Sequence, residues 1–236
     1  MARNRERGIP RERSLITLTN PRSPVSEAFR VLRTNLQFAS LDQPIRSLMV
    51  TSSGPEEGKS TTTANLAVTL AQAEQRVLLI DADLRKPSQH HIFRLPNTVG
   101  LMSVLLGRVA LQEAAQRMPS SSLSVLSSGP IPPNPAEVLA SRQMDKFLEE
   151  AGKEYDWLLI DTPPVVAVTD AQILAGKVDG VLLVVQAGRT HRDMVQKAKG
   201  LLDNVKAPLL GAVLNQKRFK GQEYYYYYYG EKGQTS

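Results

Sequence analysis

Residues 48–61, which read LMVTSSGPEEGKST, decide the fold of this chain. An apolar run leads into a glycine-containing turn, and a helix-forming run follows it from Ala64 to Leu70. This order predicts a strand, a loop and a helix in succession. Backbone N–H groups at the start of such a helix attract anions, because they have no partner inside the helix. The segment is therefore predicted to bind phosphate.

The residue types in the loop also fit a nucleotide. Gly58 lets the backbone approach a phosphate closely, Lys59 can reach the β- and γ-phosphates, and Ser60 offers a hydroxyl to Mg²⁺. The first glycine of the usual pattern would stand at position 53, where this chain has Ser53. A Gly/Ser-rich turn before a core helix is the competing interpretation, but strand, loop and helix together favour a nucleotide site. The residues predicted to hold the phosphates of ATP are Gly54, Glu57, Gly58, Lys59, Ser60 and Thr61.

Two further apolar runs end in aspartate. One run starts at Val77 and leads to Asp81 and Asp83, and another starts at Trp157 and leads to Asp161. Ligands of open α/β sheets bind at the carboxyl ends of the strands, so these carboxylates are expected beside the phosphate loop. An apolar strand ending in Asp is the Walker B arrangement, in which the carboxylate orients Mg²⁺ or its water ligands. Strand-end carboxylates can also cap a turn, but the nearby Gly-Lys-Ser loop favours a metal–nucleotide site.

Strands and helices alternate along the rest of the chain. This alternation predicts an α/β fold, namely a three-layer, doubly wound, mostly parallel sheet of the P-loop NTPase type with helices on both faces. We expect a flexible basic N-terminal arm over residues 1–20, one domain over 21–216 and a flexible tail over 217–236. Strands are expected at 46–52, 77–80, 123–126, 156–161, 180–186 and 209–215, with helices at 24–38, 61–73, 136–139, 145–153, 168–176 and 190–204 and short ones between 100 and 115.

Composition and charge exclude several classes of protein. The chain has no cysteine, which excludes disulfides, thiolate metal sites and iron–sulfur clusters. No apolar run reaches the roughly 18 residues needed to span a bilayer. The net charge is +6, but residues 1–13 hold five Arg against two Glu, and residues 217–236 hold four cations against two Glu. The ends thus carry most of the charge, which favours contact with anionic lipid or an acidic partner and argues against nucleic acid.

A cluster of six consecutive tyrosines stands near the C-terminus. Its members are Tyr224, Tyr225, Tyr226, Tyr227, Tyr228 and Tyr229, and their flanks are polar and glycine-containing. A β-prone edge segment is one interpretation. Phenols beside an ATP site suggest instead that they accept phosphate. An extended chain from Asn215 to Tyr229 would reach about 45 Å, which is ample to enter a neighbouring molecule's site.

A charged pattern lies on the helix expected over residues 24–38. Glu27, Arg30 and Arg33 recur three residues apart along one side of it. Taken alone, this pattern is a solvated face with one local ion pair, worth a few tenths of a kcal/mol.

The combination of these motifs resembles the bacterial tyrosine kinases, the P-loop autokinases that control capsular and exopolysaccharide synthesis. The resemblance runs from about Ser23 to Tyr229 and rests on GKST at 58–61, LLIDADLR at 78–85, LLIDTPP at 158–164 and the tyrosine cluster. The segment NPAEVLAS at 134–141 is also similar to theirs. A fold of the ParA/MinD-like deviant Walker type is implied, with ATP and Mg²⁺ as cofactors.

The resemblance also implies roles for single residues. Lys59, Asp81, Asp83 and Arg85 would be catalytic, and Ser60, Asp83 and Asp161 would hold Mg²⁺. One of Asp81 and Asp83 would assist the tyrosine hydroxyl, and the sequence does not separate them. Arg85 would lie near the acceptor or the γ-phosphate. Glu27, Arg30 and Arg33 match the family's self-association motif, which reverses the preference for a merely solvated face.

The implied partners follow from the same resemblance. They are further copies of the chain in a ring-like homo-oligomer, a separate transmembrane polysaccharide co-polymerase that activates the kinase, and a cognate tyrosine phosphatase. The implied location is the cytoplasm, at the inner face of the membrane through the activator.

Two alternatives to a kinase remain open at this stage. A ParA/MinD-like ATPase switch shares the fold and the acidic strands, but its signature lysine would stand where this chain has Gly54, and it lacks a tyrosine tail. A catalytically silent scaffold is the other alternative, because Glu56 places a negative charge in the phosphate loop.

Overall fold

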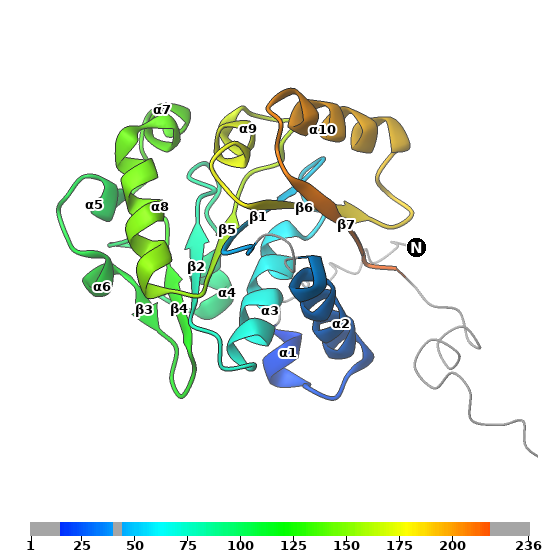
Figure 1. Cartoon of the computed structure of the whole chain (residues 1–236), viewed down its shortest axis with the longest axis horizontal. Coiled ribbons are helices and arrows are strands. Elements are labelled where there is room, and N and C mark those ends of the chain that lie inside the picture. The colour runs from blue at the N-terminus through cyan, green and yellow to red at the C-terminus, as the bar shows by residue number, and fades with distance from the viewer. Residues whose placement is uncertain (1–14, 40–43, 218–236) are drawn as a thin grey trace, which may run out of the picture.

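A seven-stranded sheet forms the centre of the computed structural model, which describes residues 15–39 and 44–217. The strand order is β3-β4-β2-β5-β1-β6-β7. The pair β3–β4 is antiparallel, and the other neighbouring pairs are parallel. Figure 1 shows α1, α2 and α3 on one side of the sheet and α9 and α10 on the other. The predicted doubly wound, mostly parallel α/β fold is confirmed.

The described elements follow one another as the alternation predicted. They are α1 (Ile16–Thr19), α2 (Pro24–Ala39), β1 (Ser47–Ser52), α3 (Lys59–Ala71), β2 (Val77–Asp81), α4 (Gln89–Phe93), α5 (Leu101–Leu105), α6 (Leu111–Ala114), β3 (Gln116–Arg117), β4 (Leu123–Leu126), α7 (Pro135–Ala140), α8 (Arg142–Glu154), β5 (Trp157–Asp161), α9 (Asp170–Ala175), β6 (Gly180–Gln186), α10 (Arg192–Asn204) and β7 (Leu209–Asn215).

Two apolar layers enclose the central strands. β1, β2 and β5 are buried along their whole length, as expected for parallel strands whose residues are apolar on both faces. One layer packs the sheet against α5, α8, α9 and α10, and the other packs it against α2 and α3. Strands held in this way fix the positions of the loops at their carboxyl ends, where the acidic motifs lie.

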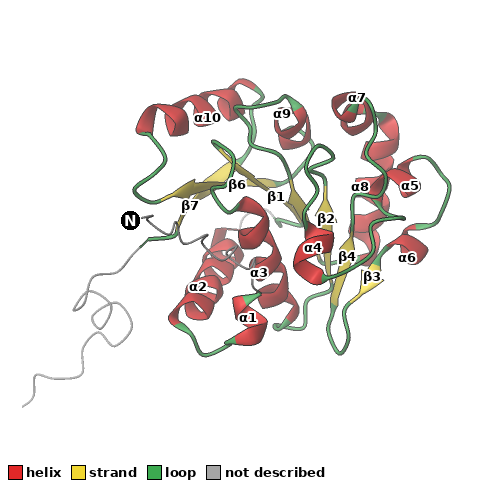
Figure 2. Ribbon diagram, turned by 180° about the vertical axis from the view of Figure 1, so that it is seen from behind, coloured by secondary structure: helices red, strands yellow, loops and turns green. Residues whose placement is uncertain are grey.

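The structure differs from the sequence-based expectation in three local elements. Helix α3 begins at Lys59, two residues before the expected start. A two-residue edge strand, β3, precedes β4 and was not expected, because so short a strand has no periodicity. Helix α4 was also missed, and Figure 2 shows it in front of β2.

The N-terminal arm expected over residues 1–20 is too long, because its last residues form part of the folded domain. Residues 16–19 form α1, and its Thr17 is 2% exposed. Thr17 donates from its backbone N–H and its hydroxyl to Oδ1 of Asn65 on α3, at 3.1 and 2.9 Å. The part of the arm over residues 15–20 is therefore held against the domain. The rest of the expected arm, and the tyrosine cluster, lie outside the described residues.

No helix within residues 15–39 and 44–217 combines the length and the apolar character needed to cross a membrane.

We expect Asn65→Ala to lower the free energy of unfolding by about 1–3 kcal/mol, because it leaves two buried donors of Thr17 without an acceptor. Urea unfolding measures the change. Asn204→Ala, at an exposed position at the end of α10, is the matched control and should change stability by less than about 0.5 kcal/mol. An Asn65→Ala variant as stable as that control would contradict the anchoring of α1.

Candidate active site

The phosphate loop connects β1, which ends at Ser52, to α3, which begins at Lys59. Gly58 caps α3 with a φ of 93°, a backbone conformation that residues with a side chain rarely adopt. A Cβ atom at this position would also lie 2.0 Å from Nδ2 of Asn215. The backbone conformation and the close approach of Asn215 therefore both require glycine at position 58. The loop leads directly into the N-terminus of α3, a helix of 13 residues.

Glu57 supports the loop from inside. Its side chain is 6% exposed, and its carboxylate accepts from the backbone N–H and the hydroxyl of Ser53 and from the hydroxyl of Thr190. Its backbone carbonyl accepts from Nδ2 of Asn215 at 2.9 Å. The sequence predicts Glu57 among the phosphate-binding residues, but the structure shows its carboxylate engaged with Ser53 and Thr190. Any contact with phosphate at this position belongs to the backbone N–H.

The Lys59 amine lies among carboxylates. Its Nζ donates to Oδ2 of Asp83 at 2.8 Å and lies 3.5 Å from Oδ1 of Asp161. The hydroxyl of Ser60 is 3.2 Å from the same nitrogen. Burial acts to lower the pKa of Lys59, but Asp161 and Asp83 outweigh it and raise that pKa. Four of the predicted site residues thus meet at one point, with the amine charged.

Asp81 and Asp161 are neighbours because β2 and β5 pair in parallel and place these two residues in register. Both are completely buried. Burial raises the pKa of Asp81 to about 7, and the Asp161 carboxylate adds to this shift. Burial also raises the pKa of Asp161, although Lys59 opposes it. Two adjacent carboxylates in a buried site cannot both carry charge cheaply unless a cation joins them.

The structure places the remaining predicted residues as follows. Gly54 accepts from the Ser52 hydroxyl at 2.7 Å, and the Thr61 carbonyl accepts from Nδ2 of Asn65 at 2.9 Å. Arg85 forms two hydrogen bonds, of 2.8 and 2.9 Å, with the buried carboxylate of Asp170 at the start of α9. The Arg85 guanidinium, which follows Asp83 in the sequence, is therefore held by the protein itself.

Glu56, the acidic residue of the loop, points to solvent. Its side chain is 80% exposed, and its carboxylate lies 3.8 Å from the guanidinium of Arg189. A solvated and partly neutralised carboxylate costs an anion site little. The negative charge of Glu56, which raised the alternative of a catalytically silent scaffold, therefore points away from the interior of the loop.

The predicted self-association residues occupy different environments on α2. Glu27 and Arg30 form an ion pair on the surface, and Arg30 also donates to the Pro21 carbonyl. Arg33 instead donates to the Thr69 carbonyl of α3 at 3.0 Å. Three apolar residues of α2, Val25, Val31 and Phe38, are each more than half exposed, and the helical spacing puts Val31 and Phe38 on the same side as Glu27.

Sequence reasoning missed four residues that hold the site together. They are Gln89, Asp170, Thr190 and Asn215, which contact Asp161, Arg85, Glu57 and the backbone of the loop respectively. Each comes from an element distant in sequence from its partner. The only signal in the sequence is that polar residues follow the ends of predicted strands or helices, which is too common to single them out.

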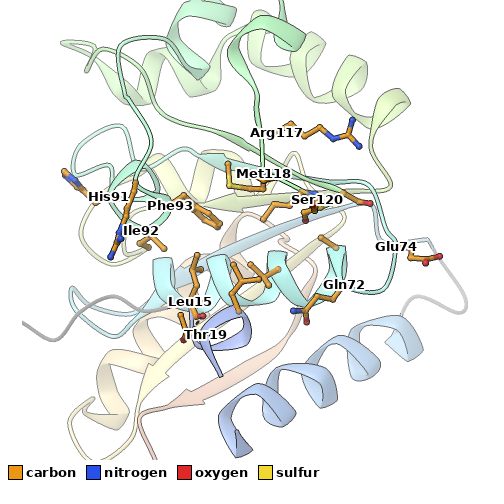
Figure 3. Close-up of a pocket in the computed structure, with 18 residues that line it drawn as sticks. Leu15, Thr19, Gln72, Glu74, His91, Ile92, Phe93, Arg117, Met118 and Ser120 are labelled. Atoms are coloured by element: carbon orange, nitrogen blue, oxygen red, sulfur yellow. Dashed lines mark hydrogen bonds between the residues drawn. The ribbon is translucent and has the colours of Figure 1, made fainter. Parts of the chain in front are cut away.

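A separate open groove of about 1390 Å³ lies between α1, α3, α4 and the β3–β4 hairpin. Figure 3 shows its mixed lining, in which apolar side chains alternate with basic and polar ones. The lining includes Leu15, Gln72, His91, Phe93, Arg117 and Met118. None of the predicted phosphate-binding or metal-binding residues lines this groove, so it is distinct from the phosphate loop.

The residues at the loop suit Mg²⁺ and a nucleotide. Oδ1 of Asp161 is buried and accepts no hydrogen bond from the described residues, and only the charge of Lys59 faces it, at 3.5 Å, so it has the capacity to take a further ligand. No cluster of three or more His, Asp or Glu side chains in residues 15–39 and 44–217 could hold a metal by itself. Mg²⁺ typically takes one or two carboxylates together with substrate phosphates, which matches Asp83, Asp161 and the adjoining loop.

Comparison with known proteins identifies the family. A family model described as "ParA: NUBPL iron-transfer P-loop NTPase" matches residues 45–235. The tyrosine-protein kinase YwqD of Bacillus subtilis (strain 168) is 50% identical over 232 residues, which are 98% of each chain. The chain belongs to the bacterial tyrosine kinases.

Two other members of the bacterial tyrosine kinases extend the comparison. The putative tyrosine-protein kinase CapB of Staphylococcus aureus is 43% identical over 211 residues, covering 89% of this chain and 92% of CapB. The crystal structure of the chimerical protein CapA2B2 superposes with a TM-score of 0.83 at 44% identity, over 86% of this chain and 89% of that one. The predicted family, its P-loop NTPase fold and its protein-tyrosine kinase class are confirmed.

We expect Gly58→Ala to lower the free energy of unfolding of this tyrosine kinase by at least about 1–2 kcal/mol, the cost of a left-handed backbone for a residue with a Cβ. The clash with Asn215 adds to that cost. Gly176→Ala is the matched control, because Gly176 has a φ of −81° and its nearest contact to a new Cβ is 3.9 Å away. Urea unfolding of both variants should separate them, and equal stabilities would refute the requirement for glycine.

Asp81 should make stability depend on pH. Its pKa is raised from the ordinary value of 3.8 to about 7 in the folded protein, so between these values the folded state binds a proton that the unfolded state has released. The free energy of unfolding therefore falls as the pH rises through this window. Asp81→Asn removes the effect, and its stability relative to wild type should be higher at about pH 8 than at about pH 5.

Urea unfolding at the two pH values measures this difference. The control is Asp156→Asn, because a hydrogen bond from Arg76 lowers the pKa of Asp156, which is thus ionised at both pH values. Its effect on stability should be the same at each. An Asp81→Asn effect that does not change with pH would show that the carboxyl is already ionised without penalty.

Proposed function

We propose that this tyrosine kinase transfers the γ-phosphoryl group of ATP to Tyr224–Tyr229, in trans within a homo-oligomer, and thereby regulates the synthesis and export of a capsular polysaccharide or exopolysaccharide. The observation that carries the proposal is the buried Lys59 amine between Asp83 and Asp161, at the N-terminus of α3. The similarity to named tyrosine-protein kinases over nearly the whole chain supports the same reaction.

The chain's own groups would bind and orient the nucleotide. The backbone N–H groups between Gly54 and Thr61, Pro55 excepted, would bind the phosphates at the start of α3, and the Lys59 ammonium would neutralise negative charge on them. Ser60, Asp83 and Asp161 would supply the oxygen ligands for Mg²⁺. When bound, Mg²⁺ spreads and neutralises charge that develops on the transferring group.

The transfer itself needs an oxygen nucleophile and a proton acceptor. The phenolic oxygen of a tail tyrosine bonds to the γ-phosphorus, the bond to the β–γ bridging oxygen breaks, and ADP leaves. The phenolic proton passes to a carboxylate of the strand end after β2. Asp81 is the stronger candidate, because its pKa of about 7 suits a general base, whereas Asp83 is already paired with Lys59.

We infer a second role for Arg85 beside its pairing with Asp170. Its side chain is 41% exposed, so the outer part of the guanidinium faces solvent at the end of β2. An acidic or phosphorylated acceptor segment could bind there without breaking the buried contact. We infer that Arg85 guides the acceptor toward the site.

Self-association would bring one molecule's tail to another molecule's site. The exposed ion pair of Glu27 and Arg30 and the exposed Val31 and Phe38 give α2 a surface that is both charged and apolar, as interfaces are. Each phosphate added to the tail brings about −1.5 to −2 charges at neutral pH. Modification of most of the cluster would exceed the chain's +6 and repel the tail from the acidic site, which would separate the subunits.

Two further proteins would act with the kinase. A separate transmembrane co-polymerase would activate the kinase and hold it at the cytoplasmic face of the membrane. A cognate tyrosine phosphatase would reverse the modification.

The test is the intact mass of purified protein after incubation with ATP and Mg²⁺. We expect a ladder of added phosphoryl groups that maps to Tyr224–Tyr229. Lys59→Met should abolish the ladder, because it removes the charge that pairs with the phosphates. Adding the cytoplasmic tail of the activator should strengthen the wild-type signal.

A chain that ends at Lys217 provides the second arm. It should still bind ATP but gain no phosphoryl groups, and it should phosphorylate the tail of a Lys59→Met molecule added in trans. Release of free phosphate by the wild type without any gain in mass, with the activator's tail present, would contradict the kinase and identify an ATPase switch.

A further inference from the structure

Gln89 links two motifs of the site through one buried amide. It begins α4, and its side chain is completely buried. Its Nε2 donates to the backbone carbonyl of Ser60 at 3.1 Å and to Oδ2 of Asp161 at 2.8 Å. Because a carbonyl and a carboxylate only accept, the amide must present its NH₂ group to them. The first turn of α3 and the end of β5 are thus joined through this side chain.

The backbone of the same residue holds the third motif. The N–H groups of Ser88 and Gln89 each donate to Oδ2 of Asp81 at 2.8 Å. The start of α4 therefore contacts the phosphate loop, the end of β2 and the end of β5 together. A displacement of Gln89 would change the relative positions of all three.

Three side-chain oxygen atoms of this cluster are buried and have no hydrogen-bond partner within the described part of the chain. They are Oδ1 of Asp161, Oε1 of Gln89 and Oγ of Ser88. The ammonium of Lys59 lies 3.5 Å from Oδ1 of Asp161. Gln89 already occupies the other oxygen of the Asp161 carboxylate. Native proteins rarely leave several buried polar atoms of one cluster without a hydrogen bond, so these atoms indicate that the cluster is arranged for a ligand from outside the chain.

We propose that Gln89 is a positioning residue for the metal ion of the nucleotide site. By occupying Oδ2 of Asp161, its amide leaves Oδ1 as the oxygen that would serve Mg²⁺ or a water bound to it. Because the same amide also donates to the Ser60 carbonyl, it fixes the position of the Asp161 carboxylate relative to the Ser60 hydroxyl. The inference deepens the proposed function and rests on it. Loss of such an outer partner typically weakens metal affinity by about 10–100-fold.

The alternative is a purely structural role, in which the amide only fills the core. The two roles make different predictions. A structural residue affects folding and every ligand together, whereas a positioning residue affects the metal more than the nucleotide. The test therefore compares the two ligands in one variant, using Mn²⁺ and ADP as probes so that no phosphate transfer is required.

The variant is Gln89→Met, which keeps the length of the side chain but removes both donors. Free Mn²⁺ is followed by electron paramagnetic resonance at saturating ADP, and ADP affinity is measured separately in EDTA. We expect Mn²⁺ affinity to fall at least about tenfold, while ADP affinity in EDTA changes by less than about twofold. Gln89→Leu should behave in the same way, which covers the case in which one variant folds poorly.

Gln72→Met is the matched control, because Nε2 of Gln72 also donates to a backbone carbonyl, that of Thr17, at the other end of α3. Its Mn²⁺ affinity should equal that of the wild type. Mn²⁺ binding by Gln89→Met within about twofold of the wild type would overturn the inference, as would an equal loss of Mn²⁺ and metal-free ADP. The readout is binding, so a failure of the proposed tyrosine phosphorylation would not alter the result.

Discussion

The buried ammonium of Lys59 is the charge on which the site depends. Asp83 and Asp161 lie 2.8 and 3.5 Å from it, and Asp81 stands beside Asp161 on the neighbouring strand. Burial raises the pKa of Asp81 and of Asp161, and the single charge of Lys59 does not offset this effect. One cation cannot compensate three buried carboxylates. The site has a deficit of positive charge. A divalent cation would meet that deficit, which is why the cluster suits a metal–nucleotide site.

The sheet supplies the rigidity that such a cluster needs. Uncompensated carboxylates repel one another and would separate if the strands were free to move. The parallel pairing of β2 with β5, and of β5 with β1, fixes their backbones, and apolar layers on both faces prevent the strands from shifting. Stability elsewhere thus offsets strain at the site, as is common where function requires an unfavourable arrangement.

Polar contacts from distant elements complete the phosphate loop. Asn215 at the end of β7 and Thr190 before α10 both bind Glu57, so the loop is held by the edge of the sheet from which the tail continues. Phosphate loops usually rely on glycine for their shape. Here the loop has Ser53 at the position of the first glycine, and the buried Glu57 carboxylate binds the Ser53 N–H and hydroxyl. The departure from the common pattern is therefore compensated inside the loop.

The sequence by itself determined the fold class, the strand ends, the phosphate loop and the family, because these depend on local periodicity and on short motifs whose chemistry is carried by neighbouring residues. Only the tertiary structure decided that Glu57 faces inward, that Arg85 pairs with Asp170 and that Gln89 and Asn215 complete the site. It also decided that α1 belongs to the domain. Each of these contacts joins residues from different elements, and the direction of a polar side chain depends on the acceptor that packing places beside it, which no local pattern specifies.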